Sequence, residues 1–383
     1  MRGEVAVYRR RGVSYIPIKM KIVCFHLFND YSGSPKVLKN TLCGLLGKGA
    51  EIELITSRGG VLDTIPAGKN LKRRSYSYKF SNNAIATTLR YTLVQLYTFF
   101  MALGYMRDKN AVFYINTILP AGPAIAGWLM GKKVIYHYHE NATVKSGFYR
   151  LLARIMQKTA TRIICVSDYQ RSFLTRRGGV CVIPNAVEED FVKRLHPAPQ
   201  EAFERKRVLM LGSLKAYKGT SEFITLAREL PQFNFELVLN DEQKNVDAFC
   251  AQQGCGSIKN LAVHPRQEDV APFYNNASLV LNLSNKELVV ETFGLTALEA
   301  MNAGLPVIVP TVGGIAEMVE DGVNGFKIDV QNLTKIKNCI ASTLLNQDLY
   351  LSLCNGALER ASEYSATRSA ERILEEITQN GTN

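Results

Sequence analysis

Two glutamates and a glycine stand close together in the second half of the chain. Glu291 lies in a predicted loop, Glu299 lies in a predicted helix, and Gly294 lies between them. A glycine lets the backbone approach a ligand closely, and the free N–H groups at a helix start favour an anion. Carboxylates accept hydrogen bonds from hydroxyl groups. This segment therefore predicts a site for a ligand that carries both hydroxyl groups and phosphate.

The elements around this segment indicate a parallel sheet. Residues 296–301 are mostly strong helix formers, and Gly304 and Pro306 end that helix. Residues 307–309 are apolar and β-branched, as in a buried strand of a parallel sheet. Because strands and helices alternate along the chain, we predict an α/β protein with doubly wound parallel sheets.

The run from 291 to 325 resembles a known enzyme family. It contains Glu-Thr-Phe-Gly-Leu, Leu-Glu-Ala-Met, Ala-Gly-Leu-Pro-Val and Gly-Gly-Ile-Ala-Glu in this order. It is similar to the nucleotide-sugar site of retaining GT-B glycosyltransferases of family 4 (glycosyl transferases group 1), of the kind found in bacterial polysaccharide biosynthesis. Their signature is two glutamates separated by seven residues. The resemblance implies a GT-B fold, in which two Rossmann-like domains face each other across a cleft. Taken alone, the segment could also be an ordinary αβ unit with a solvated helix.

The resemblance assigns roles to this segment. It implies that Glu299 accepts hydrogen bonds from the ribose hydroxyls of the donor. Glu291 is expected to bind hydroxyls of the transferred sugar and to be catalytic. The other residues of the loop and helix start that are expected to contact the donor are Thr292, Phe293, Gly294 and Leu295.

A lysine-containing loop follows the predicted strand 207–211. The family usually has an arginine after the glycine that ends this strand, and a lysine five residues later, both on the diphosphate. Lys218 matches the lysine, and its implied catalytic role is to stabilise charge on the leaving diphosphate. Ser213 stands in place of the arginine. Either Lys215 supplies the missing charge or Ser213 donates one neutral hydrogen bond; both lysines could also be solvated loop cations.

The first half of the chain contributes three further candidates. Gly33 and Ser34 lie in a turn between a strand and a helix, where the family has a glycine-rich loop that faces the donor. This turn has one glycine, and a plain βα turn is the alternative. His139 follows the strand 133–138, at the carboxyl end where open α/β sheets bind ligands. It resembles the family's cleft histidine, which contacts the donor sugar.

A metal site is a further interpretation of His137, His139 and Glu140. Residues in direct sequence along a strand do not converge on one ion, so we predict no metal site. His137 is expected to be structural. In the second half, Arg266 follows a short strand and is expected to border the nucleotide base.

The net charge of +12 is unevenly placed over the 383 residues. Residues 1–185 hold 28 basic and 8 acidic residues, whereas 186–383 hold 18 and 26. A basic first half predicts an anionic partner. Because no zinc-finger spacing, RNP motif or recognition-helix pattern accompanies the charge, nucleic acid is not expected. An anionic membrane surface or a diphosphate-linked lipid fits better. The apolar stretch 91–106 is too short to span a bilayer, and we predict a buried or interfacial helix there.

The cysteines and the start of the chain bear on location. The eight cysteines lack metal-ligand spacing, and several lie in apolar runs, which indicates buried free thiols in a reducing compartment. Residues 1–19 are basic but lack a long apolar core, so they are not a signal peptide. We predict a cytoplasmic protein, with peripheral association at the inner face of the membrane as a hypothesis.

The length suits two domains of the usual size. Loss of periodicity and several prolines place a linker between them. The predicted parts are a basic N-terminal extension that is poorly ordered or on the surface (1–19), an acceptor-binding domain (20–185), a linker (186–206), a nucleotide-sugar-binding domain (207–363) and a C-terminal helix that crosses back to the first domain (364–383).

The expected activity follows from the resemblance. A hexosyltransferase would move a sugar from a nucleotide diphosphate sugar to an acceptor hydroxyl, with retention of configuration and without a metal or other cofactor. The acceptor would be a lipid-linked or growing cell-surface glycan, as in lipopolysaccharide or capsule synthesis. One alternative is a sugar-nucleotide epimerase or hydrolase on the same fold, which would act without an acceptor. The other is a non-catalytic nucleotide-sugar-binding subunit, which the serine at position 213 favours.

Overall fold

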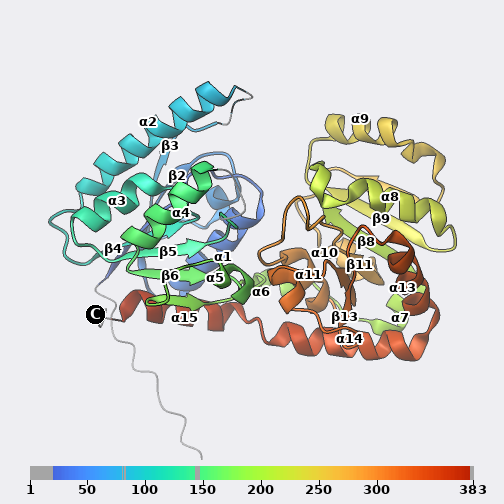
Figure 1. The fold of residues 1–383 in the computed structure, drawn as a ribbon. Coiled ribbons are helices and arrows are strands. Elements are labelled where there is room, and N and C mark those ends of the chain that lie inside the picture. Colours follow the sequence, from blue (N-terminus) through green and yellow to red (C-terminus); the bar gives the residue numbers. More distant parts are fainter. Residues whose placement is uncertain (1–19, 80, 82, 143–146, 380–383) are drawn as a thin grey trace, which may run out of the picture.

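The computed structural model describes residues 20–79, 81, 83–142 and 147–379. These residues form two lobes, each built on one sheet (Figure 1). The strand pairs in both sheets are parallel. The predicted fold class, with two doubly wound parallel sheets, is confirmed. The predicted N-terminal extension, 1–19, lies outside the described residues.

The first sheet has the strand order β3-β2-β1-β4-β5-β6-β7. Because β1 pairs with both β2 and β4, the order reverses between β1 and β4. Ligands of open α/β sheets bind at such a switch point, at the carboxyl ends of the strands. The strands are β1 (Lys21–Phe25), β2 (Glu51–Ser57), β3 (Leu71–Tyr76), β4 (Ala111–Asn116), β5 (Val134–Tyr138), β6 (Arg162–Cys165) and β7 (Val180–Val182).

Helices cover both faces of this sheet. Apolar residues of α2, α3 and α4 pack on one face, and those of α1 pack on the other. The helical elements of this lobe are α1 (Gly33–Gly47), η1 (Val61–Thr64), α2 (Ala84–Leu103), α3 (Ala121–Leu129), α4 (Gly147–Thr159) and α5 (Asp168–Ser172).

Two helix starts differ from the sequence-based expectation. The helix expected at 91–106 begins earlier, because the Asn83 side chain accepts hydrogen bonds from the N–H groups of Ile85 and Ala86 and caps α2. The turn expected to hold Gly33 and Ser34 is also shorter, because both residues already belong to the first turn of α1. Their backbone N–H groups are therefore those of a helix N-terminus.

The second sheet has the order β10-β9-β8-β11-β12-β13. Its strands are apolar and lie within one large core. They are β8 (Arg207–Gly212), β9 (Asn234–Leu239), β10 (Leu261–His264), β11 (Leu279–Leu281), β12 (Val307–Val309) and β13 (Gly325–Lys327). The helical elements are η2 (Ala216–Lys218), α8 (Thr220–Glu229), α9 (Gln243–Gln253), η3 (Cys255–Ser257), α10 (Ala271–Asn276), α11 (Leu295–Asn302), α12 (Gly314–Glu317), α13 (Leu333–Leu345) and α14 (Gln347–Ser362).

Two segments connect the lobes. The predicted linker 186–206 contains α6 (Glu189–Val192) and α7 (Pro199–Arg205), and its apolar residues join the core of the second lobe. The C-terminal α14 runs beneath the second lobe, and α15 (Ala366–Thr378) continues beneath the first (Figure 1). Ile373 and Ile377 of α15 join the core of the first lobe against α1.

No helix in the described part of the chain is long and apolar enough to cross a membrane.

Candidate functional site

A cleft of about 1000 Å³ lies between the two lobes. Its walls include the carboxyl ends of β1 and β5 from the first lobe and the loops after β8 and β11 from the second. The residues expected from the sequence to act on the donor all line this cleft; their roles stay predictions. They are Gly33, Ser34 and His139 of the first lobe, and Ser213, Lys215, Lys218, Arg266, Glu291, Thr292, Phe293, Gly294, Leu295 and Glu299 of the second.

Glu291 and Lys218 form an ion pair in the second-lobe wall. Ser284 Oγ donates a second hydrogen bond, of 2.8 Å, to Glu291 Oε1. Burial alone would raise the pKa of Glu291, but the Lys218 charge and the two hydrogen bonds outweigh it and lower the pKa below its usual value. Burial opposes the charge of Lys218, yet the Glu291 carboxylate raises the pKa of that lysine. Both groups are therefore charged at neutral pH, and the ammonium of Lys218 retains N–H groups for an anion.

Two glycines allow this wall to form. Gly294 has φ 93° at the start of α11, and a Cβ there would lie 2.5 Å from the Ile315 side chain. Gly219 has φ 73°, and a Cβ there would lie 2.3 Å from the carbonyl oxygen of Leu283. Side chains other than hydrogen rarely fit such positions. The glycines thus bring the start of α11 and the turn that carries Lys218 to the same wall of the cleft.

Glu299 lies on α11 and lines the cleft as well. Tyr274 Oη donates a 2.6 Å hydrogen bond to its Oε2. Burial raises the pKa of Glu299 above its usual value, against the smaller opposing effects of Lys36 and Tyr274. Lys36 belongs to α1 and lines the cleft from the first lobe. A carboxylate of this kind favours partners that donate hydrogen bonds, such as vicinal hydroxyls.

The loop after β8 adds one positive charge to the cleft. Lys215 lies in this loop, and its charge also lowers the pKa of Glu291. Within the described residues, Lys215 forms no ion pair. Ser213 lines the cleft in the same loop. The structure therefore leaves both alternatives for the missing arginine in place: Lys215 as a cation and Ser213 as a neutral donor.

His139 is held by a chain of hydrogen bonds along the carboxyl edge of the first sheet. Its Nε2–H donates to Asn116 Oδ1 at 2.9 Å, and Asn116 Nδ2 donates to His26 Nδ1 at 3.0 Å. His26 Nε2–H in turn donates to the carbonyl oxygen of Phe28 at 2.8 Å. Burial, with smaller contributions from His137 and His26, holds the pKa of His139 well below its usual value. His139 is therefore a neutral imidazole whose Nδ1 carries the lone pair.

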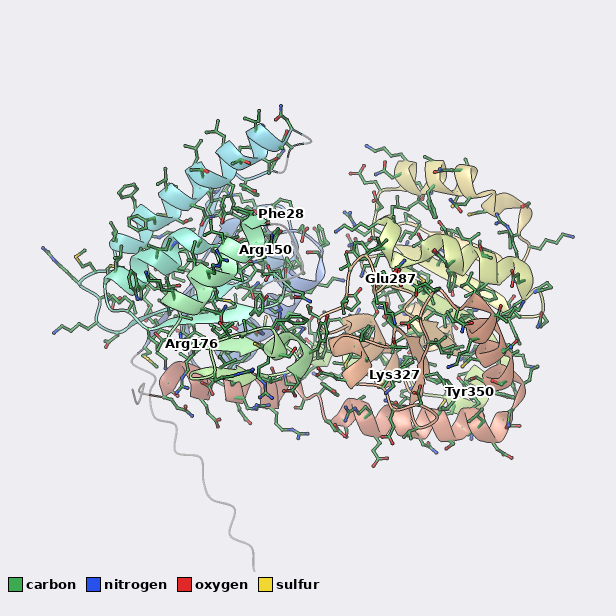
Figure 2. All side chains as sticks on the ribbon, in the orientation of Figure 1. Phe28, Arg150, Arg176, Glu287, Lys327 and Tyr350 are labelled. Carbon is green, nitrogen blue, oxygen red and sulfur yellow. The ribbon has the colours of Figure 1, made fainter. Side chains whose placement is uncertain are left out.

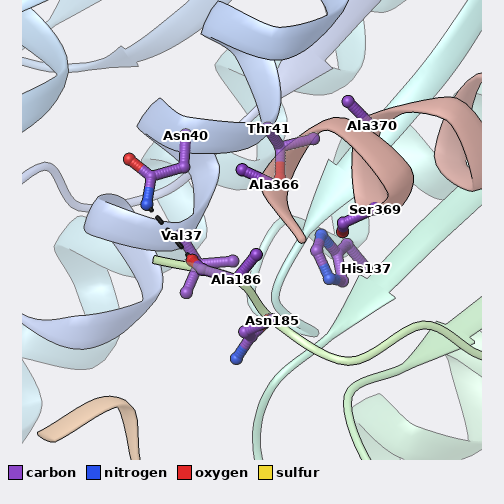
Figure 3. Close-up of a pocket in the computed structure, with 9 residues that line it drawn as sticks. All are labelled: Val37, Asn40, Thr41, His137, Asn185, Ala186, Ala366, Ser369 and Ala370. Carbon is purple, nitrogen blue, oxygen red and sulfur yellow. Dashed lines mark hydrogen bonds between the residues drawn. The ribbon is translucent and has the colours of Figure 1, made fainter. Parts of the chain in front are cut away.

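The ring of His137 lies beside that of His139, with the two ring centroids 4.2 Å apart, and it also lines a small cavity (Figure 3). That cavity has a volume of about 20 Å³, which is enough for one water molecule but not for a substrate. Tyr114 Oη lies 2.7 Å from His137 Nδ1, and burial lowers the pKa of His137 to about 3. Among the described residues, no group of three or more His, Cys, Asp or Glu side chains could hold a metal ion.

The two lobes touch directly beside Glu291. Thr292 Oγ1 donates a 2.7 Å hydrogen bond to the carbonyl oxygen of His139, and Ser167 Oγ donates one of 2.7 Å to the carbonyl oxygen of Thr292. A Cβ at Gly314 would lie 1.9 Å from that Thr292 oxygen, so the contact requires glycine there. The loop that carries Glu291 is therefore fixed against the first lobe at His139.

A second contact between the lobes lies at Arg266. Its guanidinium lies 5.4 Å from the ring centroid of Tyr31, which belongs to the first lobe. Arg266 Nε also donates to Asn240 Oδ1 at 2.8 Å. Arg266 lines the cleft in this position, and the flat guanidinium and aromatic ring offer surfaces on which a base can stack.

Comparison with protein families identifies the chain. Residues 31–191 match the model described as Glycosyltransferase Family 4, and residues 192–360 match the model described as Glycosyl transferases group 1. The two models together cover both lobes. The chain belongs to the GT-B glycosyltransferases.

Curated glycosyltransferases align with parts of the chain. An uncharacterized glycosyltransferase of Methanocaldococcus jannaschii is 26% identical over 223 residues, which is 57% of this chain and 60% of that protein. A D-inositol 3-phosphate glycosyltransferase of Thermobispora bispora is 30% identical over 129 residues, 34% of this chain and 29% of that protein. The chain thus spans less than two thirds of the length of these relatives.

Solved glycosyltransferase structures resemble the whole described fold. Anabaena HepE in complex with UDP and glucose has a TM-score of 0.76 at 18% identity, covering 94% of this chain and 100% of that one. WaaG, a glycosyltransferase involved in lipopolysaccharide biosynthesis, has a TM-score of 0.69 at 17% identity, with coverage of 94% and 100%. At these identities the likeness shows the GT-B fold.

Several residues of this GT-B cleft were missed from the sequence. They either support a predicted residue or face it from the other lobe. In the first lobe a sequence pattern could have revealed the polar row, because a polar residue ends or directly follows each of the neighbouring strands β1, β4 and β5. No comparable pattern marks Ser284 or Tyr274. The missed residues are His26, Lys36, Asn116, Tyr274 and Ser284.

Proposed function

We propose that this glycosyltransferase moves a sugar from a nucleotide diphosphate sugar to an acceptor hydroxyl. The observation that carries the proposal is the second-lobe wall, where two carboxylates, a lysine and a helix start line one cleft. Carboxylates suit the hydroxyls of the two sugars of such a donor, and the lysine and helix start suit its diphosphate. HepE, which has the same fold, was crystallised with UDP-glucose, which supports a donor of this class.

In this proposal the donor lies along the second lobe. Glu299 accepts from the ribose hydroxyls, and Glu291 accepts from hydroxyls of the transferred sugar. The sugar lies next to His139, whose neutral ring provides an acceptor at Nδ1. Arg266 borders the base. The start of α1, with Gly33 and Ser34, faces the diphosphate from the first lobe.

Lys218 stabilises the negative charge that develops on the leaving diphosphate. Lys215 and the start of α11 add to this effect, and we infer that they replace a divalent metal. Enzyme treated with EDTA is expected to keep its rate. A rate that falls with EDTA and returns with Mg²⁺ or Mn²⁺ would contradict this part of the proposal.

We infer retention of configuration, with the leaving phosphate assisting deprotonation of the acceptor, from the resemblance of the donor segment to retaining enzymes. NMR of the anomeric proton in the first product formed tests this. An inverted anomer would exclude the mechanism. Cleft closure over the donor would exclude water and suppress hydrolysis.

The acceptor is inferred to be a lipid-linked or growing cell-surface glycan. The basic first half favours an anionic partner, and WaaG, a structural neighbour, acts in lipopolysaccharide biosynthesis. We infer a cytoplasmic location for the enzyme, with peripheral association at the inner face of the membrane.

A thermal-shift screen against UDP-, GDP- and dTDP-sugars tests donor binding, and a Glu299→Gln variant serves as its control. Stabilisation by one sugar nucleotide, weaker in the variant, is the expected result. Turnover is then measured with and without acceptors. Release or isomerisation of the sugar without an acceptor would indicate a hydrolase or epimerase, and binding without turnover would indicate a non-catalytic subunit.

A further inference from the structure

Large apolar side chains form an exposed stripe along α2. Their spacing along the helix repeats every three or four residues, which places them on one side. Between 50% and 80% of each side chain is exposed. We call this stripe the α2 surface, and its residues are Ile85, Leu89, Leu93, Leu96, Tyr97 and Phe100.

The opposite side of α2 is firmly packed. Val94, Thr98 and Ala102 are buried there. The Gln95 side chain accepts a 2.8 Å hydrogen bond from the N–H of Gly122 in α3, and a Cβ at Gly122 would lie 2.2 Å from the Gln95 carbonyl oxygen. Because α2 and α3 fit this closely, the helix cannot rotate to bury the α2 surface.

Apolar side chains of the neighbouring helices extend the α2 surface. Trp128 and Leu129 of α3 are 44% and 61% exposed, and Phe148 and Leu151 of α4 are 44% and 52% exposed. The Phe148 ring centroid lies 5.2 Å from that of Tyr91 in α2, so the two helices meet there. Figure 1 shows α2, α3 and α4 next to one another on one side of the first lobe. Large apolar side chains that are exposed next to one another often mark an interaction site.

Basic side chains accompany these apolar side chains on α2 and α4. Arg150, Arg154 and Lys158 are exposed on α4, and Arg90 is exposed on α2. In the part of the chain that the structure describes, none of the four forms an ion pair. Residues 71–159 contain 13 basic residues and 2 acidic ones. Figure 2 shows Arg150 on the side of the first lobe where α4 lies, with side chains of α2 projecting outward.

We propose that the α2 surface docks on an anionic lipid bilayer, with α2 lying in the plane of the interface. Apolar side chains enter the acyl boundary while basic side chains contact the anionic headgroups. A second copy of the chain is a poorer partner, because a two-fold contact would bring equal positive charges together. A membrane span is not available to α2, since one of its sides is packed against α3.

The α2 surface lies one layer away from the cleft. Tyr91 Oη donates a 2.7 Å hydrogen bond to the carbonyl oxygen of Leu119, in the loop after β4. The neighbouring Ile118 N–H donates to Glu140 Oε2 at 3.3 Å, and Glu140 lines the cleft on the first-lobe side. The bilayer would therefore touch the lobe that is expected to bind the acceptor. This link, which rests on the proposed function, identifies the acceptor as an amphiphile held at the membrane surface.

Liposome flotation tests the docking. The full chain is mixed with liposomes of phosphatidylcholine and phosphatidylglycerol, or of phosphatidylcholine alone. The test variant is Leu93→Asp/Leu96→Asp. The matched control is Leu345→Asp on α13 of the second lobe, where Leu345 is 60% exposed. We expect binding to the anionic liposomes, a loss of about tenfold or more in the test variant, and no loss in the control.

The outcomes separate docking from the proposed activity. Circular dichroism and thermal shift with the donor show whether the test variant is folded and binds the sugar nucleotide, independently of the liposome result. Failure of the wild-type chain to bind anionic liposomes, or equal binding to neutral ones, overturns the docking. Analytical ultracentrifugation that finds a dimer disrupted by the same two substitutions would show a contact between copies and also overturn it. Absence of donor binding by the wild-type chain would instead count against the proposed function.

Discussion

Replacing Lys218 by Met removes the ion pair with Glu291 and so tests what that pair contributes to stability and activity. Glu291 would then keep the hydrogen bond from Ser284 but lose its counter-charge. Breaking a fully buried pair costs about 3–5 kcal/mol, and an exposed pair contributes about 0–1 kcal/mol. The side chains of Lys218 and Glu291 are 24% and 19% exposed, so solvent screens part of the effect. We expect the free energy of unfolding at neutral pH to fall by about 1–3 kcal/mol.

The loss of unfolding free energy in Lys218→Met should increase with pH. In the wild-type protein the pKa of Glu291 is lowered on folding, so its contribution to stability is present above the unfolded pKa and is lost as the pH falls through the folded one. Without Lys218 the burial remains, and the pKa of Glu291 is then raised. The carboxylate then costs stability as the pH rises through that window. The difference between variant and wild type should therefore grow from about pH 4 to about pH 7.

Two further variants separate stability from catalysis. Lys218→Met/Glu291→Gln removes the uncompensated charge and is expected to regain most of the lost stability, but not the activity. Lys215→Met removes an exposed cation of the same cleft, and its stability is expected to change by less than about 0.5 kcal/mol. Loss of Lys218 should lower turnover by about 10²–10³-fold, as for other donors aimed at developing charge.

Urea denaturation across this pH range and turnover with saturating donor are the two assays. A stability loss in Lys218→Met that is the same at every pH would show that the ion pair is not its cause. A double variant as unstable as the single one would lead to the same conclusion. Turnover of Lys218→Met within a factor of about ten of wild type would refute the role at the leaving group.

Three other perturbations follow from the site. Glu299→Gln should be more stable than wild type at about pH 8 but not at about pH 5, because a carboxyl whose pKa is raised on folding costs stability once it ionises. Thermal denaturation measures this difference in stability. The same difference at both pH values would contradict the prediction. Asn116→Asp places a carboxylate beside His139 and should raise the pKa of that imidazole. The pH–rate profile should therefore change on its acid side. An unaltered profile would show that this hydrogen bond does not set the protonation of His139. Gly314→Ala should lower kcat by about tenfold or more, because its Cβ would displace Thr292 beside the reacting centre; a normal kcat would show that the two lobes need not meet there.

The sequence predicts the site best where the functional residues lie within one short segment of known local structure. The segment from Glu291 to Pro310 predicts a loop, a helix and a buried strand, and the structure forms α11 and β12 there. The predicted donor residues all line one cleft, although they come from both halves of the chain. The reason is geometric, since the carboxyl ends of parallel strands share one edge and two such edges face each other.

Contacts between residues far apart in the chain could not be predicted from the sequence. The hydrogen bond from Asn116 to His26 joins residues 90 positions apart and depends on the register between β1 and β4. The contact from Thr292 to His139 spans 153 positions and depends on how the lobes meet. The early start of α2 has a local cause, since the side chain of Asn83 caps the helix.

The position of α15 has a consequence for biosynthesis. Ile373 and Ile377 complete an apolar core whose other members come from the first 183 residues. Lys133 Nζ also donates a 2.9 Å hydrogen bond to the carbonyl oxygen of Ile377. A ribosome that has finished the amino-terminal lobe has therefore not yet made the helix that covers it. The half of the enzyme that emerges first therefore reaches its final packing only after the second lobe has been made, and part of its apolar surface stays uncovered until then.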